Sequence, residues 1–345
     1  MRYRFLNDQT TTVSEVGFGV WSVATTWWGI KDQPTGLRLL REAHDAGVTF
    51  YDTADVYGNG LGESLLADAF WKNGVPRDRL VIATKFGYDI YSHGGERSGH
   101  GELPQDFSAG FIRKACEESL RRLGTDYIDI YQLHNPRMEA IRSDEVLETL
   151  DQLKRQGKIR IGGAALGPDI GWYDEGMESM QRDGLDAIQI IYSLLEQDPA
   201  SGFFPESERK NTNLIVRVPH ASGLLDRSYT QAKPYDKSDH RSHRKDKWME
   251  SGLAAVRALE FLETDRRRLS QAAIQFCLAQ PAVKTVLPNF TRSEQIREFC
   301  AASDLPPLPI ESLQEIKRLW DDTLRESLTQ PFSNSITKPS PVMSA

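Results

Sequence analysis

Short β-favouring runs alternate with helical segments along most of this chain. Eight runs are rich in β-branched and aromatic residues, and nearly all are separated by stretches with apolar residues at helical spacing. Alternation of this kind builds parallel sheets, and eight units favour a (β/α)8 TIM barrel over an open doubly wound sheet. The expected strands are Val16–Trp21, Val48–Tyr51, Arg79–Phe86, Tyr127–His134, Lys158–Gly163, Asp186–Ile191, Asn213–Val218 and Lys284–Leu287.

The alternation predicts one large domain. Helical spacing continues after the eighth strand, over Ser293–Ala302 and Ile310–Leu328, so extra C-terminal helices are expected. We expect residues 1–328 to form a single barrel domain, since such barrels use roughly 250 residues or more. Residues 329–345 are rich in Pro, Ser and Thr without periodicity, which predicts a disordered tail.

Charge and hydropathy argue against two broad classes of protein. The net charge of −7 argues against a general nucleic-acid binder, which needs a concentrated basic surface. No apolar run approaches the roughly 20 residues that cross a bilayer, and the amino terminus lacks an apolar signal core. We expect a cytoplasmic protein with a small-molecule partner and neither a nucleic-acid nor a membrane partner. One basic run, Asp239–Lys247, is interpreted as a solvated loop.

Neither cysteines nor histidines indicate a metal site. Cys116, Cys277 and Cys300 are widely spaced in helix-like segments, which favours buried free thiols over a disulfide. The polar insertion Tyr88–Gln105 holds two histidines, but no cysteines or tight ligand spacing accompany them. Its length and glycine content suggest a lid over a pocket instead.

Four residues suited to proton chemistry follow three of the expected strands. Asp52 comes directly after Val48–Tyr51, and Tyr57 lies on the loop beyond it. Lys85 and His134 lie at the carboxyl ends of the next two strands. Because barrels of this type carry their active sites at the carboxyl ends of their strands, we expect these four side chains to face one pocket.

The four residue types match what carbonyl reduction requires. A cofactor delivers hydride to carbon, and a side chain supplies a proton to oxygen. A tyrosine, with an ordinary pKa near 10, needs a cation beside its oxygen to act at neutral pH. Lys85 would supply that cation to Tyr57, Asp52 would hold the lysine, and His134 would orient the carbonyl group. Each residue alone is more often a cap, a packing residue or a solvated side chain.

Three runs resemble one known family. DTADVYGNGLGE, ATKFG and DYIDIYQLHNP occur in this order and resemble the aldo-keto reductases, over roughly Val13–Leu328. The resemblance implies an enzyme that interconverts an aldehyde or ketone and the alcohol by hydride transfer with NADP(H). It implies that Tyr57 is the general acid/base, with Lys85, Asp52 and His134 in the roles given above. Two alternatives stay open: a nucleotide-binding regulatory or sensor barrel with little turnover, and a mainly oxidative sugar or polyol dehydrogenase.

The resemblance also implies a cofactor site at the barrel mouth. No G-x-G-x-x-G fingerprint follows the first strand. Gln189 matches a glutamine that holds the nicotinamide carboxamide, Glu298 one that reads the adenine, and Arg292 is placed to bind a 2′-phosphate, which favours NADPH over NADH. The alternative for Arg292 is a solvated first-turn residue. The expected cofactor-binding residues are Gly19, Trp21, Gln189, Arg217, Ser222, Gly223, Leu225, Pro288, Asn289, Arg292, Gln295 and Glu298.

The sequence departs from the family pattern in three places. Ala165 and Leu166 stand where a Ser-Asn pair usually grips the carboxamide, a loss on the order of 1 kcal/mol for each contact that leaves a partner unpaired. Phe299 replaces an asparagine near the adenine. Arg217 or Val218 replaces an aromatic residue near the nicotinamide ring. Arg217 could select an anionic substrate or form a structural ion pair.

Aromatic residues after strand ends are candidates for the walls of a substrate pocket. Trp21, Trp28, Phe86 and Tyr88 all follow expected strand ends. Packing within loops is the alternative interpretation for these four residues.

Overall fold

Eight parallel strands form the centre of the molecule. The computed structural model describes residues 1–25, 29–30, 32–92, 102–167, 172–230, 235–236 and 239–329. The strands pair in sequence order, and the first and last meet through a parallel bridge between Val16 and Val286, which makes a nearly closed (β/α)8 barrel. The strands are β3 (Phe18–Gly19), β4 (Phe50–Asp52), β5 (Val81–Phe86), β6 (Ile128–His134), β7 (Ile159–Ala165), β8 (Ala187–Ile191), β9 (Asn213–Arg217) and β10 (Val283–Leu287).

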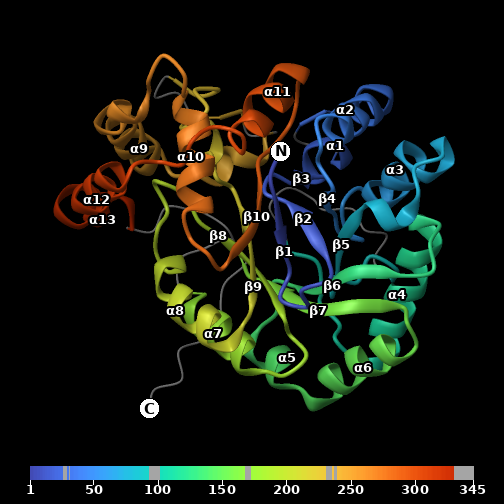
Figure 1. Ribbon diagram of the computed structural model, residues 1–345. Coiled ribbons are helices and arrows are strands. Elements are labelled where there is room, and N and C mark those ends of the chain that lie inside the picture. Colours follow the sequence, from blue (N-terminus) through green and yellow to red (C-terminus); the bar gives the residue numbers. More distant parts are fainter. Residues whose placement is uncertain are drawn as a thin grey trace, which may run out of the picture.

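Helices surround the barrel as an outer ring, which Figure 1 shows in a view along the barrel axis. Most lie where helical spacing predicted them. Three short helices, α1, α5 and α8, were not predicted, because one or two turns are too short to establish a 3.6-residue period. The helices are α1 (Trp21–Ala24), α2 (Gln33–Asp45), α3 (Leu61–Ala69), α4 (Ala109–Leu123), α5 (Met138–Arg142), α6 (Asp144–Arg155), α7 (Tyr173–Gln181), α8 (Phe204–Lys210), α9 (Asp246–Ala258), α10 (Leu269–Leu278), α11 (Ser293–Ala301), α12 (Ile310–Leu319) and α13 (Arg325–Leu328).

Each barrel strand is buried on both faces. On β9, Leu214 and Val216 pack in the large core between strands and helices, whereas Ile215 packs in a second cluster inside the barrel. Phe50 of β4 and Ala83 of β5 belong to that inner cluster as well. Because side chains alternate along a strand, these inner positions identify which later residues of each strand face the barrel lumen.

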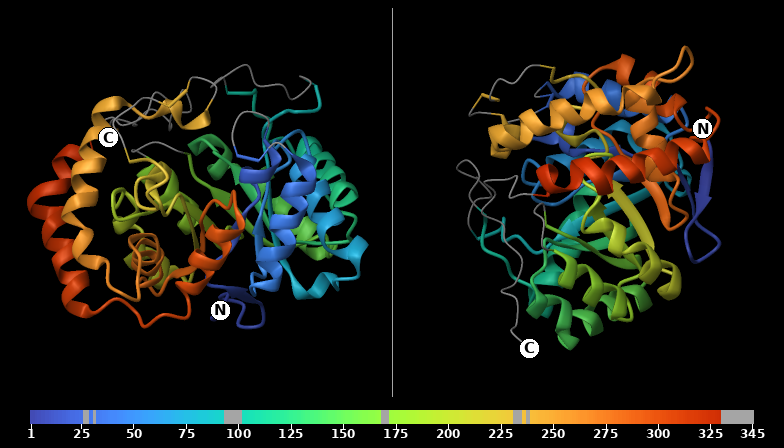
Figure 2. Two further views of the ribbon diagram at one scale, coloured as in Figure 1. Left: turned by 90° about the horizontal axis from the view of Figure 1, so that it is seen from above. Right: turned by 90° about the vertical axis from the view of Figure 1, so that its left-hand side faces the viewer.

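A β-hairpin that was not predicted closes the amino-terminal end of the barrel. Its strands, β1 (Tyr3–Phe5) and β2 (Thr12–Ser14), pair antiparallel with each other. Leu6 and Val13 are buried and join the inner cluster. The hairpin lies at one end of the barrel in both views of Figure 2. It therefore covers the end of the lumen opposite the carboxyl ends of the strands.

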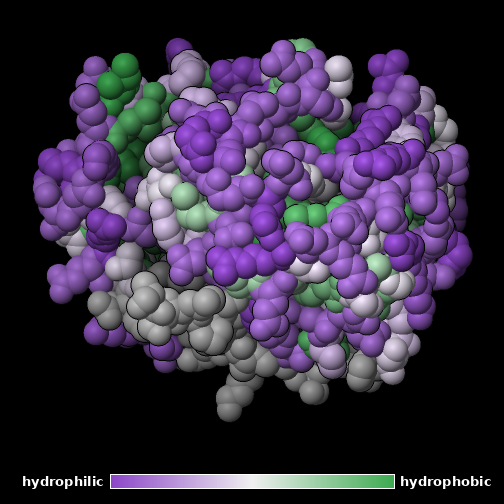
Figure 3. Space-filling model, turned by 90° about the horizontal axis from the view of Figure 1, so that it is seen from below, coloured by the Kyte–Doolittle hydropathy of each residue, from purple (hydrophilic) through white to green (hydrophobic). Residues whose placement is uncertain are grey.

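The C-terminal helices pack on the outside of the barrel. Helix α12 continues through a π-helical turn, Trp320–Leu324, into α13, which packs beside α9. The predicted tail, residues 329–345, lies outside the described residues except for Thr329. No described helix is both long enough and apolar enough to span a membrane. Hydrophilic residues cover most of the face shown in Figure 3.

Candidate active site

Three barrel strands carry the predicted polar residues to the same end of the lumen. Phe50, Ala83 and Ile130 face the interior, so the residues two positions later on β4, β5 and β6 also face inward. Two of these are Asp52 and Lys85. The third is Gln132, and His134 follows on the same face of β6.

Lys85 lies at the centre of the site. Its Nζ donates to Asp52 Oδ2 at 2.6 Å and to the Thr53 carbonyl oxygen at 2.8 Å. The same nitrogen lies 3.3 Å from the Tyr57 hydroxyl oxygen. Burial alone lowers the pKa of Lys85, but Asp52 and Tyr57 outweigh it, and the pKa is raised. The lysine is therefore a cation that contacts both the carboxylate and the phenol.

Two glutamines hold the other oxygen of the Asp52 carboxylate. Gln189 Nε2 on β8 donates to Asp52 Oδ1 at 2.8 Å, and Gln132 Nε2 on β6 donates at 3.3 Å. Sequence reasoning did not identify Gln132, although its place two residues before His134 was the available signal. Gln189, the expected carboxamide ligand, thus also holds the Asp52 carboxylate. The Oε1 atom of Gln132 is buried and has no hydrogen-bond partner among the described residues.

Tyr57 stands on the loop after β4, half buried, with aromatic groups on two sides. The Trp21 ring packs edge-on at 4.7 Å between centroids, and the His134 ring lies at 6.0 Å. The loop ends at Gly60, whose φ of 89° belongs to the left-handed region. A Cβ there would lie 2.2 Å from Arg122 Cδ, so glycine is needed before α3 begins.

Residues flanking the long insertion support His134 from behind. Tyr88 packs its ring edge-on against His134 at 5.0 Å, and its hydroxyl donates to Glu102 Oε1 at 2.9 Å. Gln105 Nε2 donates to the His134 carbonyl oxygen at 2.8 Å. The central part of the predicted lid, residues 93–101, lies outside the described residues. Its two ends hold a residue of the site in place.

The predicted aromatic walls divide into different roles. Trp21 contacts Tyr57 at the barrel mouth. Phe86 was expected in the pocket, but it lies in the outer core and stacks on Tyr131 at 4.4 Å. The reason is alternation: Lys85 points inward, so the next residue points outward. Tyr88 is fully buried behind His134, and Trp28 lies outside the described residues.

The end of β10 and the start of α11 offer groups for the cofactor. The Cβ position of Gly19 has only Asn289 Oδ1 and the Pro288 carbonyl oxygen nearby, both at 3.9 Å, so the backbone there is open to a ligand. Arg292 is exposed at the N-cap of α11, and its guanidinium has no partner among the described residues. Unpaired donors at this helix terminus suit a phosphate group.

The loop after β9 has an unusual backbone. Val218, Ala221 and Ser222 have φ values of 60°, 47° and 58°, and Gly223 has 99°. Left-handed conformations of this kind are sparsely populated by residues other than glycine and turn backbone N–H groups toward anions. Leu225 is buried beneath the loop. This loop holds the expected cofactor-binding residues Ser222, Gly223 and Leu225, although the N–H groups of Ala221 and Gly223 already donate to the carbonyl oxygens of Val218 and His220.

The basic run that follows is not simply a solvated loop. Arg244 is only 6% exposed, and its guanidinium forms an ion pair with Glu196 at 2.8 Å. It also donates to Ser222 Oγ at 2.9 Å and stacks over Trp248 at 4.2 Å. The interpretation of residues 239–247 as a solvated loop was wrong for Arg244, because it is buried by partners that include Glu196 and Ser222 from two other segments.

Three residues expected near the adenine have partners within the protein. Gln295 Oε1 accepts from the Thr291 N–H at 2.8 Å, and Glu298 accepts from Ser270 Oγ. Phe299 is buried against His220, with ring centroids 4.3 Å apart. The residues at the mouth thus fit a nicotinamide dinucleotide at Gly19, the Ser222 loop and Arg292. At the adenine end, Glu298 of α11 also accepts from Ser270 of α10 and so joins the two helices.

The positions of the missing carboxamide ligands are filled by backbone and by an arginine. Ala165 and Leu166 end β7 without polar side chains. Arg217 Nη2 donates to the Leu166 carbonyl oxygen at 2.8 Å. Arg217 forms no ion pair within 4.0 Å among the residues that the structure describes, so the structural ion pair considered above is not found there.

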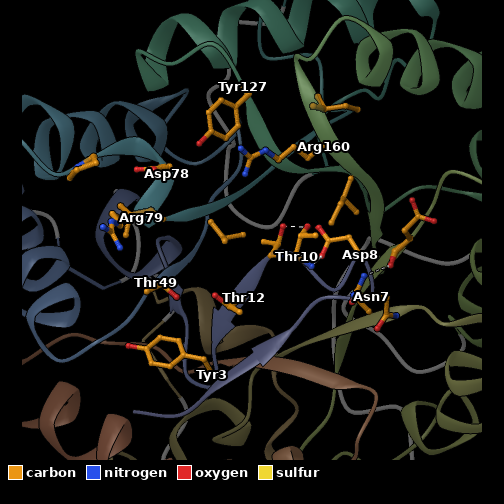
Figure 4. Close-up of a pocket in the computed structure, with 18 of the residues that line it drawn as sticks. Tyr3, Asn7, Asp8, Thr10, Thr12, Thr49, Asp78, Arg79, Tyr127 and Arg160 are labelled. Atoms are coloured by element: carbon orange, nitrogen blue, oxygen red, sulfur yellow. Dashed lines mark hydrogen bonds between the residues drawn. The ribbon is translucent and has the colours of Figure 1, made fainter.

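A polar hollow of about 1590 Å³ lies at the opposite end of the barrel. Figure 4 shows hairpin residues such as Tyr3 and Asp8 facing Arg79, Tyr127 and Arg160 across it. The last three precede or begin barrel strands. This hollow is therefore separate from the site around Tyr57.

The chain is similar to known proteins over most of its length. The model of the aldo/keto reductase family matches residues 15–321. An uncharacterised oxidoreductase of Bacillus subtilis, YqkF, is 31% identical over 333 residues, which cover 94% of this chain and 98% of that protein. The NADH-specific methylglyoxal reductase of Escherichia coli is 30% identical over 311 residues, covering 87% and 93%. The holo form of aldo-keto reductase AKR11C1 from Bacillus halodurans has a TM-score of 0.76 at 30% identity, covering 96% of this chain and 100% of that one.

Proposed function

The chain belongs to the aldo/keto reductase family, and on this premise we propose that it interconverts an aldehyde or ketone and the corresponding alcohol with NADP(H). Membership supports an NAD(P)H-dependent oxidoreductase with a small-molecule substrate. The finer proposal concerns which residue moves the proton and which nicotinamide cofactor is used.

Tyr57 is proposed as the general acid/base. The observation that carries this proposal is the chain of contacts from Asp52 through Lys85 to the Tyr57 oxygen, at 2.6 and 3.3 Å. As Tyr57 releases its proton to the carbonyl oxygen, negative charge develops on the phenol, and the Lys85 cation stabilises that charge. Asp52, held by two glutamines, keeps the lysine in place. The same groups serve the reverse reaction, in which Tyr57 accepts the proton.

His134 is proposed to orient the substrate. Its ring lies beside Tyr57, with centroids 6.0 Å apart, and Tyr88 fixes its other side. A hydrogen bond from His134 to the carbonyl oxygen would hold that atom near the Tyr57 hydroxyl. Trp21 packs edge-on against the Tyr57 ring and limits its positions.

A nicotinamide dinucleotide, when bound, supplies or accepts the hydride. Gly19, Trp21, Ser222, Gly223, Leu225, Pro288 and Asn289 are proposed to line its site. Gln189 is proposed for its nicotinamide end, and Arg292, Gln295 and Glu298 for its adenosine end. NADPH is proposed over NADH because Arg292 is an exposed cation without a counter-ion among the described residues, and a guanidinium matches phosphate geometry.

Cofactor titration tests this proposal first. The purified chain is titrated with NADPH and with NADH while quenching of tryptophan fluorescence is followed. We expect NADPH to bind about 10-fold more tightly or better, the gain typical of a charge-assisted hydrogen bond. Arg292→Gln should lose this preference, whereas Arg297→Gln, an exposed position on the same helix, should keep it. Tighter binding of NADH, as the name of the E. coli relative states for that enzyme, would overturn the cofactor choice.

Turnover tests the reaction itself. Oxidation of the preferred cofactor is followed with a panel of aldehydes and ketones, and its reduction with the matching alcohols. Turnover with members of either panel supports the proposed reaction. Cofactor binding without turnover in either direction would contradict it.

A further inference from the structure

One arginine inside the barrel mouth, Arg217, has no ion-pair partner among the described residues. Arg217 ends β9, and Ile215, two residues earlier, packs inside the barrel. Because side chains alternate along a strand, the Arg217 guanidinium points into the mouth. Burial lowers the pKa of Arg217, and the nearby oxygens of Tyr57, Asp52 and Glu196 offset this only in part. An arginine remains charged at neutral pH, so a cation lies near the proton donor.

The guanidinium has hydrogen-bonding capacity to spare. Of its five N–H donors, one is used by the Leu166 carbonyl oxygen at 2.8 Å. This contact fixes the plane of the guanidinium against the end of β7, where Ala165 provides no polar group. No other described residue accepts a hydrogen bond from the Arg217 guanidinium, so its remaining donors are available to a ligand.

Other charges around the mouth cancel in pairs. Three ion pairs lie at the carboxyl ends of the strands or on the loops beyond them: Lys85–Asp52 at 2.6 Å, Arg244–Glu196 at 2.8 Å and Arg137–Glu102 at 3.0 Å. Arg217 has no such counter-ion among the described residues, and Arg292 lies farther out, exposed at the start of α11. Among the described residues of the inner mouth, Arg217 is therefore a cation without an ion-pair partner of its own.

A ligand anion is the natural counter-ion for this charge. A partly buried cation without a counter-ion is unfavourable, and a bound anion removes that cost. The oxidised nicotinamide ring is itself cationic, and the cofactor phosphates are assigned above to Arg292 and the Ser222 loop. The substrate carbonyl must reach Tyr57 to receive its proton, so the body of the substrate shares the mouth with Arg217.

We infer that the substrate is an aldehyde or ketone bearing a carboxylate or phosphate group, and that Arg217 binds this group and determines specificity. The inference rests on the proposed function, because it presumes that a carbonyl compound meets Tyr57. A guanidinium binds either oxyanion through paired N–H···O bonds.

Matched substrate pairs test the inference. We would measure kcat/KM for succinic semialdehyde against pentanal, and for glyceraldehyde 3-phosphate against glyceraldehyde. The wild-type protein should prefer the anionic member of at least one pair. Arg217→Gln should lower kcat/KM for that anion by about 10- to 100-fold and change the neutral partner only a few-fold. Arg217→Lys keeps the charge and should retain part of the preference.

A matched control separates local from global charge. Arg79→Gln removes one positive charge from the exposed surface at the opposite end of the barrel. It should leave the ratio of kcat/KM between the anionic and the neutral member of each pair unchanged. The inference would be overturned if this ratio were equal in wild type and Arg217→Gln. It would also be overturned if wild type preferred the neutral over the anionic member of both pairs. An equal loss on both members of a pair, with weaker cofactor binding, would assign Arg217 to the cofactor instead. Turnover of neither class by wild type would overturn the proposed function itself.

Discussion

At the scale of single residues, the site depends on one phenol whose surroundings are charged on one side and aromatic on the others. Lys85 Nζ lies 3.3 Å from the Tyr57 oxygen, and the Trp21 ring lies 4.7 Å from the Tyr57 ring. The cation stabilises a phenolate, and the aromatic contact limits the positions that the ring can occupy. A proton donor held in this way loses little entropy when the substrate binds.

Removing the Tyr57 hydroxyl should separate catalysis from binding. Tyr57→Phe keeps the ring and its contact with Trp21 but cannot transfer a proton. We expect kcat to fall by about 10²- to 10⁴-fold, the contribution typical of general acid catalysis, while the dissociation constant of NADPH changes only a few-fold. Steady-state rates and cofactor titration measure the two effects. Tyr173→Phe, at an exposed ring on α7, is the control, and a near-native rate for Tyr57→Phe would rule out this acid.

At the scale of elements, a buried polar cluster joins the catalytic loop to α3, α4 and β5. Glu63 on α3 accepts from Arg122 Nε at 2.6 Å and from Thr84 Oγ1 at 2.7 Å. Asp55 lies fully buried nearby, and neither of its carboxyl oxygens has a hydrogen-bond partner among the described residues. Two carboxyl groups thus share one arginine. Burial, and then the charge of Glu63, raise the pKa of Asp55 well above its usual value.

This raised pKa makes stability depend on pH. A carboxyl group whose pKa is higher in the folded than in the unfolded state binds an extra proton on folding. Its contribution to the stability of the fold is fully present below its pKa in the unfolded state, near 3.9, and is lost as the pH rises toward its pKa in the folded state. Asp55→Asn removes this titration. The free energy of unfolding of the variant should therefore rise relative to that of wild type by about 1.4 kcal/mol per pH unit across that window.

Thermal or urea unfolding at several pH values checks this expectation. The free energies of unfolding of the two proteins should differ least near pH 4 and increasingly above it. Asp183→Asn, at an exposed position, should follow the wild-type curve at every pH. Parallel curves for Asp55→Asn and wild type would mean that Asp55 is ionised in the folded protein.

At the scale of the whole molecule, the barrel has one end for stability and one for chemistry. The hairpin β1–β2 places Leu6 and Val13 into the lumen cluster at the amino-terminal end. Asp52, Lys85 and His134 face the other end. That residues 1–328 form a single domain remains a prediction. The packing of hairpin and strand residues in one lumen cluster supports it.

Shortening a hairpin side chain should therefore lower stability without changing chemistry. Leu6 is 1% exposed, and Leu6→Ala should cost about 2–5 kcal/mol through lost burial and a cavity. The folded fraction should keep its kcat, because the hairpin lies at the opposite end of the barrel from Tyr57. Phe5→Ala, at a position 60% exposed on the same hairpin, should change stability by only about 0.5 kcal/mol. A loss of kcat with Leu6→Ala at full folding would contradict the separation of the two ends.

The amino-acid sequence by itself determined the barrel and the order of its strands, because both depend on local periodicity. Alternation of short apolar runs with helical segments indicated the eight strands, and polar residues after three of them pointed to Asp52, Tyr57, Lys85 and His134.

Only the tertiary structure decided which partners these residues have. Gln189 is 137 residues from Asp52 along the chain, and Arg244 meets Glu196 and Ser222 from separate segments. Leu6 and Val13 lie in a polar stretch whose burial depends on the open end of a barrel built from later residues. Local patterns record the preferences of a residue for its neighbours in the chain, whereas burial and charge pairing depend on elements that meet only after folding.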